Sequence, residues 1–225
     1  MSARPLIFAI SLLTAANAGA TISRAMQFDE KVDNAAAIVL GKCVNNVSRW
    51  DAAGKWILTY STFRVEKSMK GAPMQEITLV TPGGAVNGVH QETIGVPKFD
   101  LGDDHVVFVK NTRVGPTVLY FDQGAYDVES VRGERVVRPA VSAAVLVDEQ
   151  RGMAVAPEEP STLRAFEDRV QHRMRERREF ERMQVLKQQQ VAQSSLINVL
   201  KRNKVLVALA LIGAVLATIQ LLKRW

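Results

Sequence analysis

The chain has 225 residues, of which 47% are hydrophobic, enough for one globular domain and further segments. Its formal charge of +6 is uneven, because residues 161–225 hold 13 Lys and Arg against 5 Asp and Glu, whereas residues 1–160 hold 16 against 18. The first 160 residues therefore lack the basic surface typical of nucleic-acid binding, and we expect no nucleic-acid partner. Cys43 is the only cysteine, which excludes an intrachain disulfide.

Residues 1–20 have the pattern of a cleaved export signal. Arg4 precedes an apolar core at residues 6–13, and small residues follow. Small-x-small patterns end at Ala18 and at Ala20, so we expect cleavage after one of these two residues. The alternative interpretation is a buried N-terminal helix.

Short strand-like runs alternate with turn residues between positions 36 and 130. The first two runs, 36–50 and 56–67, flank the turn Asp51-Ala52-Ala53-Gly54 and predict a long hairpin. Five more runs follow, at 76–81, from 89 onward, and at 105–110, 117–122 and 125–130. No helical stretch here is long enough for a crossover, so the pattern predicts a mainly β, antiparallel fold. We interpret residues 21–140 as a small closed barrel rather than a sandwich.

Several stretches of this region resemble known barrel modules. The order of signals is similar to that of the oligonucleotide/oligosaccharide-binding (OB)-like barrel of netrin-like and tissue-inhibitor-of-metalloproteinase modules. The matching stretches are Ala36-Ala37-Ile38-Val39-Leu40-Gly41, Met69-Lys70-Gly71 and residues 102–109. A group of secreted bacterial domains of unassigned function is more similar, through Pro82-Gly83-Gly84 and residues 95–102. The resemblance implies an OB-like fold.

One feature of the tissue inhibitors has no counterpart in this chain. Those proteins coordinate protease zinc through a cysteine at the mature N-terminus, whereas Cys43 lies inside an expected strand. The resemblance therefore does not imply inhibitory chemistry.

Residues 141–160 are less regular and end in a Pro- and Glu-rich linker. Ser161 or Thr162 then fits a helix N-cap, and residues 161–200 predict a long basic amphipathic helix that forms a stalk. We expect a hinge in the polar run 188–195. Three interpretations of the helix stay open: a solvated stalk with Glu–Arg pairs, a segment lying on anionic lipid headgroups, and a coiled segment that binds a partner.

An uncharged apolar run starts at Val205 and ends at Leu222. Its eighteen residues would form roughly 27 Å of helix, close to the ~30 Å of bilayer hydrocarbon. We therefore expect a single C-terminal transmembrane helix at 205–222 that contacts membrane lipid, with residues 223–225 as a basic cytoplasmic end. Together with the signal, this predicts a single-pass membrane protein whose β domain is extracytoplasmic, in the periplasm or at the cell surface. A tail-anchored protein with a cytosolic β domain is the alternative, because the basic residues before the run outnumber those after it.

No catalytic, cofactor or metal site is predicted. The three histidines, His90, His105 and His172, do not have zinc-ligand spacing, and the sequence lacks the common catalytic motifs. A possible binding surface comprises Trp50, Trp56 and Tyr60 as stacking groups, together with Gly83 and Gly84, whose amides would face a ligand. The alternatives are cross-strand pairing for the two tryptophans and a bend demanded by the barrel for the glycines.

These features predict a membrane-anchored extracytoplasmic binding or scaffolding protein, not an enzyme, that presents its β domain on a helical stalk. We expect it to act through contacts with a protein partner of unknown identity. A regulator of an exported protease and an envelope enzyme without a recognisable motif are the alternatives.

Overall fold

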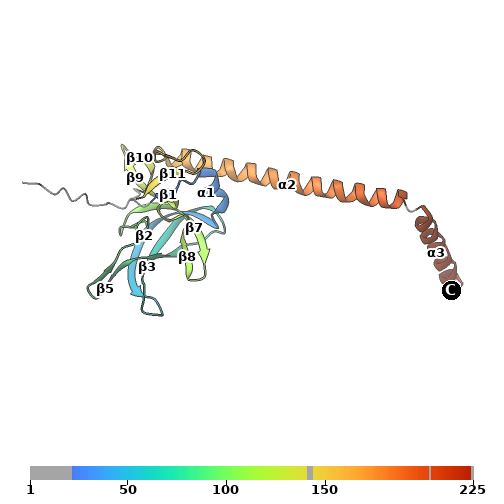
Figure 1. Cartoon of the computed structure of the whole chain (residues 1–225), viewed down its shortest axis with the longest axis horizontal. Coiled ribbons are helices and arrows are strands. Elements are labelled where there is room, and N and C mark those ends of the chain that lie inside the picture. Colours follow the sequence, from blue (N-terminus) through green and yellow to red (C-terminus); the bar gives the residue numbers. More distant parts are fainter. Residues whose placement is uncertain (1–21, 141–143, 203, 224–225) are drawn as a thin grey trace, which may run out of the picture. The chain divides into compact units, whose positions relative to one another are not determined.

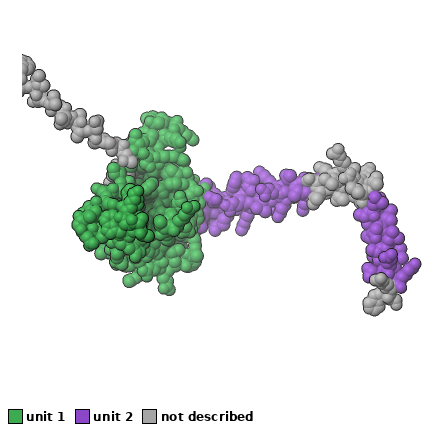
Figure 2. Space-filling model, turned by 60° about the horizontal axis from the view of Figure 1, so that its bottom comes forward, with its two compact units in different colours: residues 1–167 green, residues 168–225 purple. Residues whose placement is uncertain are grey.

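The computed structural model describes residues 22–140, 144–202 and 204–223. The expected export signal, with cleavage at Ala18 or Ala20, lies outside this range. The chain divides into two compact units, residues 1–167 and residues 168–225 (Figure 2). All described strands belong to the first unit.

An eight-stranded antiparallel sheet forms most of the first unit (Figure 1). The order along the sheet is β13-β10-β9-β7-β2-β3-β4, and β8 pairs with β7 beside this path. The long hairpin predicted at 36–67 corresponds to β2 (Ala37–Trp50) and β3 (Ile57–Lys70). The other strands are β4 (Glu76–Pro82), β7 (Asp104–Thr112), β8 (Gly115–Val118), β9 (Ala125–Val131), β10 (Glu134–Pro139) and β13 (Ser161–Thr162).

The predicted closed OB-like barrel is wrong. A closed barrel has no free edge, whereas β13 and β4 end the path of this sheet in the described chain. Strand β8 lies close to β4: if Gly115 carried a Cβ, that atom would be 3.2 Å from Val80 Cγ2. The two strands are nevertheless not paired by backbone hydrogen bonds. Strand β8 has only four residues, and one of them, Pro116, has no N–H to donate.

Among the described residues, two smaller sheets and three helices accompany the large sheet, and the fold is sheet-rich and mixed. Strand β1 (Ile22–Arg24) pairs in parallel with β11 (Val145–Asp148), which also pairs with β12 (Met153–Ala154). Strands β5 (Gly84–Val86) and β6 (Val89–Gln91) form a short hairpin. The helices are α1 (Phe28–Asn34), α2 (Leu163–Arg202) and α3 (Lys204–Leu222), with a 3-10 turn at Phe121–Gly124.

Alternation along the strands separates two clusters of buried side chains in the first unit. One cluster includes Val39, Cys43, Phe63 and Val107. The other is aromatic: Phe28 of α1 and Tyr126 of β9 contact Phe166, in the first turn of α2, with ring centroids 5.3 and 5.0 Å apart. The opening turn of α2 therefore belongs to the packed core of this unit.

The expected hinge at 188–195 is also wrong, because α2 is one continuous helix of 40 residues. The glutamines of this run are good helix formers, so their polarity does not interrupt the backbone hydrogen bonds.

The predicted transmembrane helix is wrong as well. None of the described helices is both long enough and apolar enough to cross a membrane. This finding contradicts the predicted membrane anchor from Val205 to Leu222. It also contradicts the predictions of a single-pass membrane protein and of its location, which depended on that anchor.

Candidate functional site

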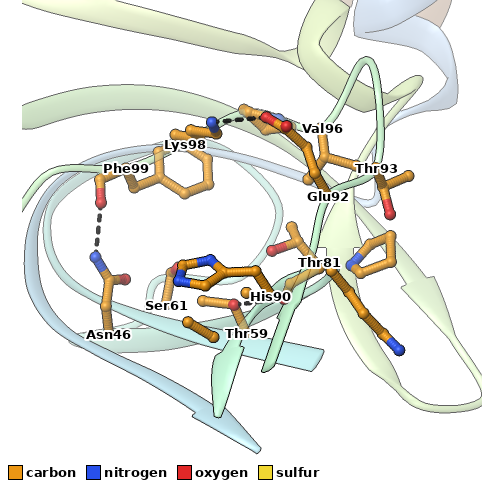
Figure 3. Close-up of a pocket in the computed structure, with 16 residues that line it drawn as sticks. Asn46, Thr59, Ser61, Thr81, His90, Glu92, Thr93, Val96, Lys98 and Phe99 are labelled. Carbon is orange, nitrogen blue, oxygen red and sulfur yellow. Dashed lines mark hydrogen bonds and ion pairs between the residues drawn. The ribbon is translucent and has the colours of Figure 1, made fainter. Parts of the chain in front are cut away.

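A cavity of about 470 Å³ opens beside strands β3 and β4 in the first unit (Figure 3). Its lining comes from two parts of the chain. The sheet contributes Asn46, Thr59, Ser61 and Thr81, and the β5–β6 hairpin with the segment after it contributes His90, Glu92, Thr93, Val96, Lys98 and Phe99. Figure 3 shows Thr59 and Ser61 on one side of this space, with Lys98 and Phe99 across from them.

The turn Pro82-Gly83-Gly84 folds the β5–β6 hairpin back over the sheet. Both glycines have positive φ, +102° at Gly83 and +132° at Gly84. A Cβ on Gly84 would lie 2.5 Å from Thr59 Oγ1 and would also overlap Ser48, so a side chain does not fit there. The amide of Gly83 donates to the carbonyl oxygen of Ile57 at 2.8 Å, so that amide is not directed at a ligand. Gly83 and Gly84 line the cavity, but their observed role is to form the bend.

Gln91 fixes the hairpin to the turn of the long β2–β3 hairpin. Its Oε1 accepts from the amide of Ile57 at 2.7 Å, and its Nε2 donates to the carbonyl oxygen of Lys55 at 3.2 Å. Through these two hydrogen bonds, the Gln91 side chain holds the β5–β6 hairpin, which forms one wall of the cavity, against the β2–β3 hairpin.

The polar groups beside the sheet fall into two classes. Asn46 and Thr59 are already engaged: Asn46 Nδ2 donates to the Phe99 carbonyl oxygen at 2.6 Å, and Thr59 Oγ1 donates to the Gly83 carbonyl oxygen at 2.7 Å. Ser61 and Thr81 are only 2% and 5% exposed, and their hydroxyls have no hydrogen-bond partner among the described residues. Both residues line the cavity, where their hydroxyls can meet a ligand.

The charged groups at the cavity neutralise each other. Lys98 Nζ lies 3.0 Å from Glu92 Oε1, and both side chains are exposed. The hydrogen bond and the positive charge of Lys98 lower the pKa of the Glu92 carboxyl. His90 is the remaining titratable group of the lining.

The three aromatic residues of the predicted binding surface do not line this cavity. Trp50 and Trp56 are 36% and 56% exposed near the tip of the β2–β3 hairpin, where the register places Trp50 opposite Ile57 rather than opposite Trp56. Tyr60 lies under the guanidinium of Arg49, 3.7 Å from the ring centroid. Gly83 and Gly84 line the cavity, whereas Trp50, Trp56 and Tyr60 are not among its lining residues.

His105 has a partner that the sequence did not indicate. It is buried, and its Nδ1 lies 3.0 Å from Asp127 Oδ1 on β9, while its Nε2 is buried without a hydrogen-bond partner. The rings of Phe63 and Phe99 pack edge-on against the imidazole. Within residues 22–140, 144–202 and 204–223, no group of three or more His, Cys, Asp or Glu side chains is placed to hold a metal ion.

Ser61 and Thr81 were missed because hydroxyl residues in strands carry no motif. The sequence did contain one indication of the position of Ser61. In a strand, Ser61 lies on the same face as Ile57 and Phe63, and the hydrophobic pattern predicts that this face points into the core. Thr81 is on the neighbouring strand, opposite Thr59 in the observed register. Only that register brings the two hydroxyls to one cavity.

Comparisons of this chain with known protein families, with curated proteins and with solved structures gave no match. The resemblance to netrin-like and inhibitor modules therefore stays a prediction.

Proposed function

We propose that this chain is a binding protein whose ligand occupies the cavity between the β3–β4 sheet and the β5–β6 hairpin. The observation that supports the proposal is that Ser61 and Thr81, which are largely buried residues, both line the cavity and have hydroxyls without a protein partner among the described residues. A hydroxyl that lines a cavity and has no protein partner can donate a hydrogen bond to a ligand and accept one from it. The cavity volume of about 470 Å³ also falls in the range usual for small-ligand sites.

The surroundings of the two hydroxyls favour binding over covalent catalysis. An activated hydroxyl nucleophile needs a base within hydrogen-bond distance. Among the described residues, no imidazole or carboxylate lies at that distance from Ser61 or Thr81. We therefore do not assign the cavity to the enzyme alternative.

Two variants and a control test this proposal. Ser61→Ala and Thr81→Val remove the hydroxyls with little change in shape, so the free protein should be as stable as the wild type or slightly more stable. Thr62→Val is the control, because the Thr62 hydroxyl bonds to Thr78 at 3.0 Å, away from the cavity. The full chain is screened by thermal denaturation against soluble metabolites, glycans and short peptides.

A ligand that stabilises the wild type and Thr62→Val, but not Ser61→Ala/Thr81→Val, would support the proposal. Ligands that stabilise all three proteins equally, or a screen with no stabilising ligand, would contradict it.

A second candidate function is protein binding through the tip of the β2–β3 hairpin. The observation that favours it is the exposure of Trp56 beside Trp50 on a turn that Asp51 braces by accepting from two backbone amides. Rigid, exposed aromatic side chains are frequent anchors of protein interfaces. A partner captured in stoichiometric amount by the wild type and by the exposed-site control Val114→Ser, but not by Trp50→Ser/Trp56→Ser, would support this function. Capture by all three, or by none, would contradict it.

A further inference from the structure

We infer that the cavity selects a neutral ligand rich in alcohol groups, such as a polyol or a single sugar ring, an assignment that rests on the proposed function above. Three properties of the lining lead to it: its charge balance, the type of its free polar groups and its apolar surface.

The lining offers no unpaired charge to an ionic ligand. Its two charged side chains, Glu92 and Lys98, are bonded to each other at 3.0 Å and are 75% and 82% exposed in their side chains. A phosphate or a carboxylate would have to compete with Glu92 for Lys98, and an ammonium group would have to compete with Lys98 for Glu92. Burying an ion without a partner is costly, so the lining disfavours both signs of charge.

Apart from the exposed imidazole of His90, the free polar side chains of the lining are hydroxyls. Ser61, Thr81 and Thr93 each lack a described partner for the side-chain oxygen, and each can both donate and accept a hydrogen bond. Such groups match a ligand whose own groups also donate and accept, which is the property of an alcohol. Ser61 and Thr81 are 2% and 5% exposed as residues, so their hydroxyls meet a ligand at the floor of the cavity rather than on the open surface.

An apolar surface completes the site. Val96, Pro97 and Phe99 belong to the same lining, and Pro97 and Phe99 are buried. A polyol or sugar ring has C–H faces between its hydroxyl groups, so it can pack on these residues while it bonds to Ser61 and Thr81. A ligand composed only of polar groups would leave this apolar surface without contacts.

The test measures binding of matched ligands to the full chain at pH 8 by titration calorimetry. The probes are neutral monosaccharides and polyols of varied stereochemistry, the corresponding uronic acids, phosphates and amino sugars, and free amino acids. We expect at least one neutral member to bind. Its affinity should fall about tenfold or more in Ser61→Ala/Thr81→Val, because two hydrogen bonds are lost.

Two further variants test whether a loss of affinity comes from the missing hydroxyls rather than from damage to the fold. Thr81→Ser keeps the hydroxyl and should retain the affinity within about threefold, and Thr62→Val should not change it. A melting temperature measured for each variant shows that it is folded.

The outcomes separate this inference from the proposed function. Binding confined to charged probes, and weakened by the double variant, would overturn the ligand class while leaving the cavity as the site. Binding that the double variant does not weaken would overturn both. If no neutral probe binds, the ligand class is wrong, and the wider screen described above decides the proposed function.

Discussion

The ammonium of Lys31 lies 2.5 Å from the carboxylate of Glu158, although 127 positions separate the two residues in the chain. Lys31 is 4% exposed, and its Nζ also donates to the hydroxyl of Tyr126 and, at 3.2 Å, to the carbonyl oxygen of Gln123. The segment before α2, which the sequence indicated only as a stiff linker, is therefore attached to α1 and to β9.

We predict that Glu158→Ala destabilises the protein by about 1–3 kcal/mol, because a buried ammonium loses its anionic partner. The cost should stay below that of breaking a fully buried pair, since the Glu158 side chain is 28% exposed. The measurement is urea unfolding of the full chain. Glu159→Ala is the matched control, since this neighbour is exposed, and it should change the free energy of unfolding by less than about 0.5 kcal/mol. Equal effects of the two substitutions would show that the ion pair does not hold the linker.

Two glycines of the β5–β6 hairpin should respond differently to the same substitution. Gly84 has φ +132° and no room for a Cβ, whereas Gly88 has φ +81° and nothing within 4 Å of a Cβ. Gly88→Ala should therefore cost only about 1–2 kcal/mol of backbone strain. Gly84→Ala should cost about 1–3 kcal/mol more, because the methyl group collides with Ser48 and Thr59. Comparison of the two melting temperatures checks the prediction, and equal shifts would mean that the hairpin does not depend on this close approach.

The sequence predicted local features of this fold better than its long-range ones. The turn after Trp50 and the alternation along β3 were found because turn residues and a period of two are local properties. The barrel was not realised, because closure depends on pairing between β4 and β8, whose residues lie far apart in the chain. The same reason hid the cavity: Ser61 and Thr81 are ordinary strand residues until the register of β3 with β4 brings them to one face.

The thiol of Cys43 should be unreactive in the folded protein. Cys43 is fully buried, and its burial raises the pKa of the thiol, so the reactive thiolate is scarce at neutral pH. We predict slow labelling by a disulfide reagent under native conditions and fast labelling in urea, with a rate that follows unfolding. Because the folded pKa is the higher one, the unfolded chain loses this proton first, and stability should fall as pH rises above the ordinary thiol value of about 8.5. Native labelling as fast as labelling of the unfolded chain would contradict this prediction.

The turn before Trp56 should open at acidic pH. Asp51 Oδ1 accepts from the amides of Trp56 and Lys55 at 3.0 and 2.7 Å, and these two hydrogen bonds lower the pKa of the Asp51 carboxyl. A carboxyl with a lowered folded pKa stabilises the turn above its unfolded value of about 3.9, and this contribution is lost as pH falls through the folded pKa. The amide NMR signals of Lys55 and Trp56 should therefore shift together on acidification, below pH ~4. Asp51→Asn retains an acceptor oxygen and should keep the turn while removing the transition, whereas Asp51→Ala should increase amide exchange at both positions even at neutral pH. An unchanged pair of signals down to the acid unfolding of the whole domain would show that the Asp51 carboxylate does not brace this turn.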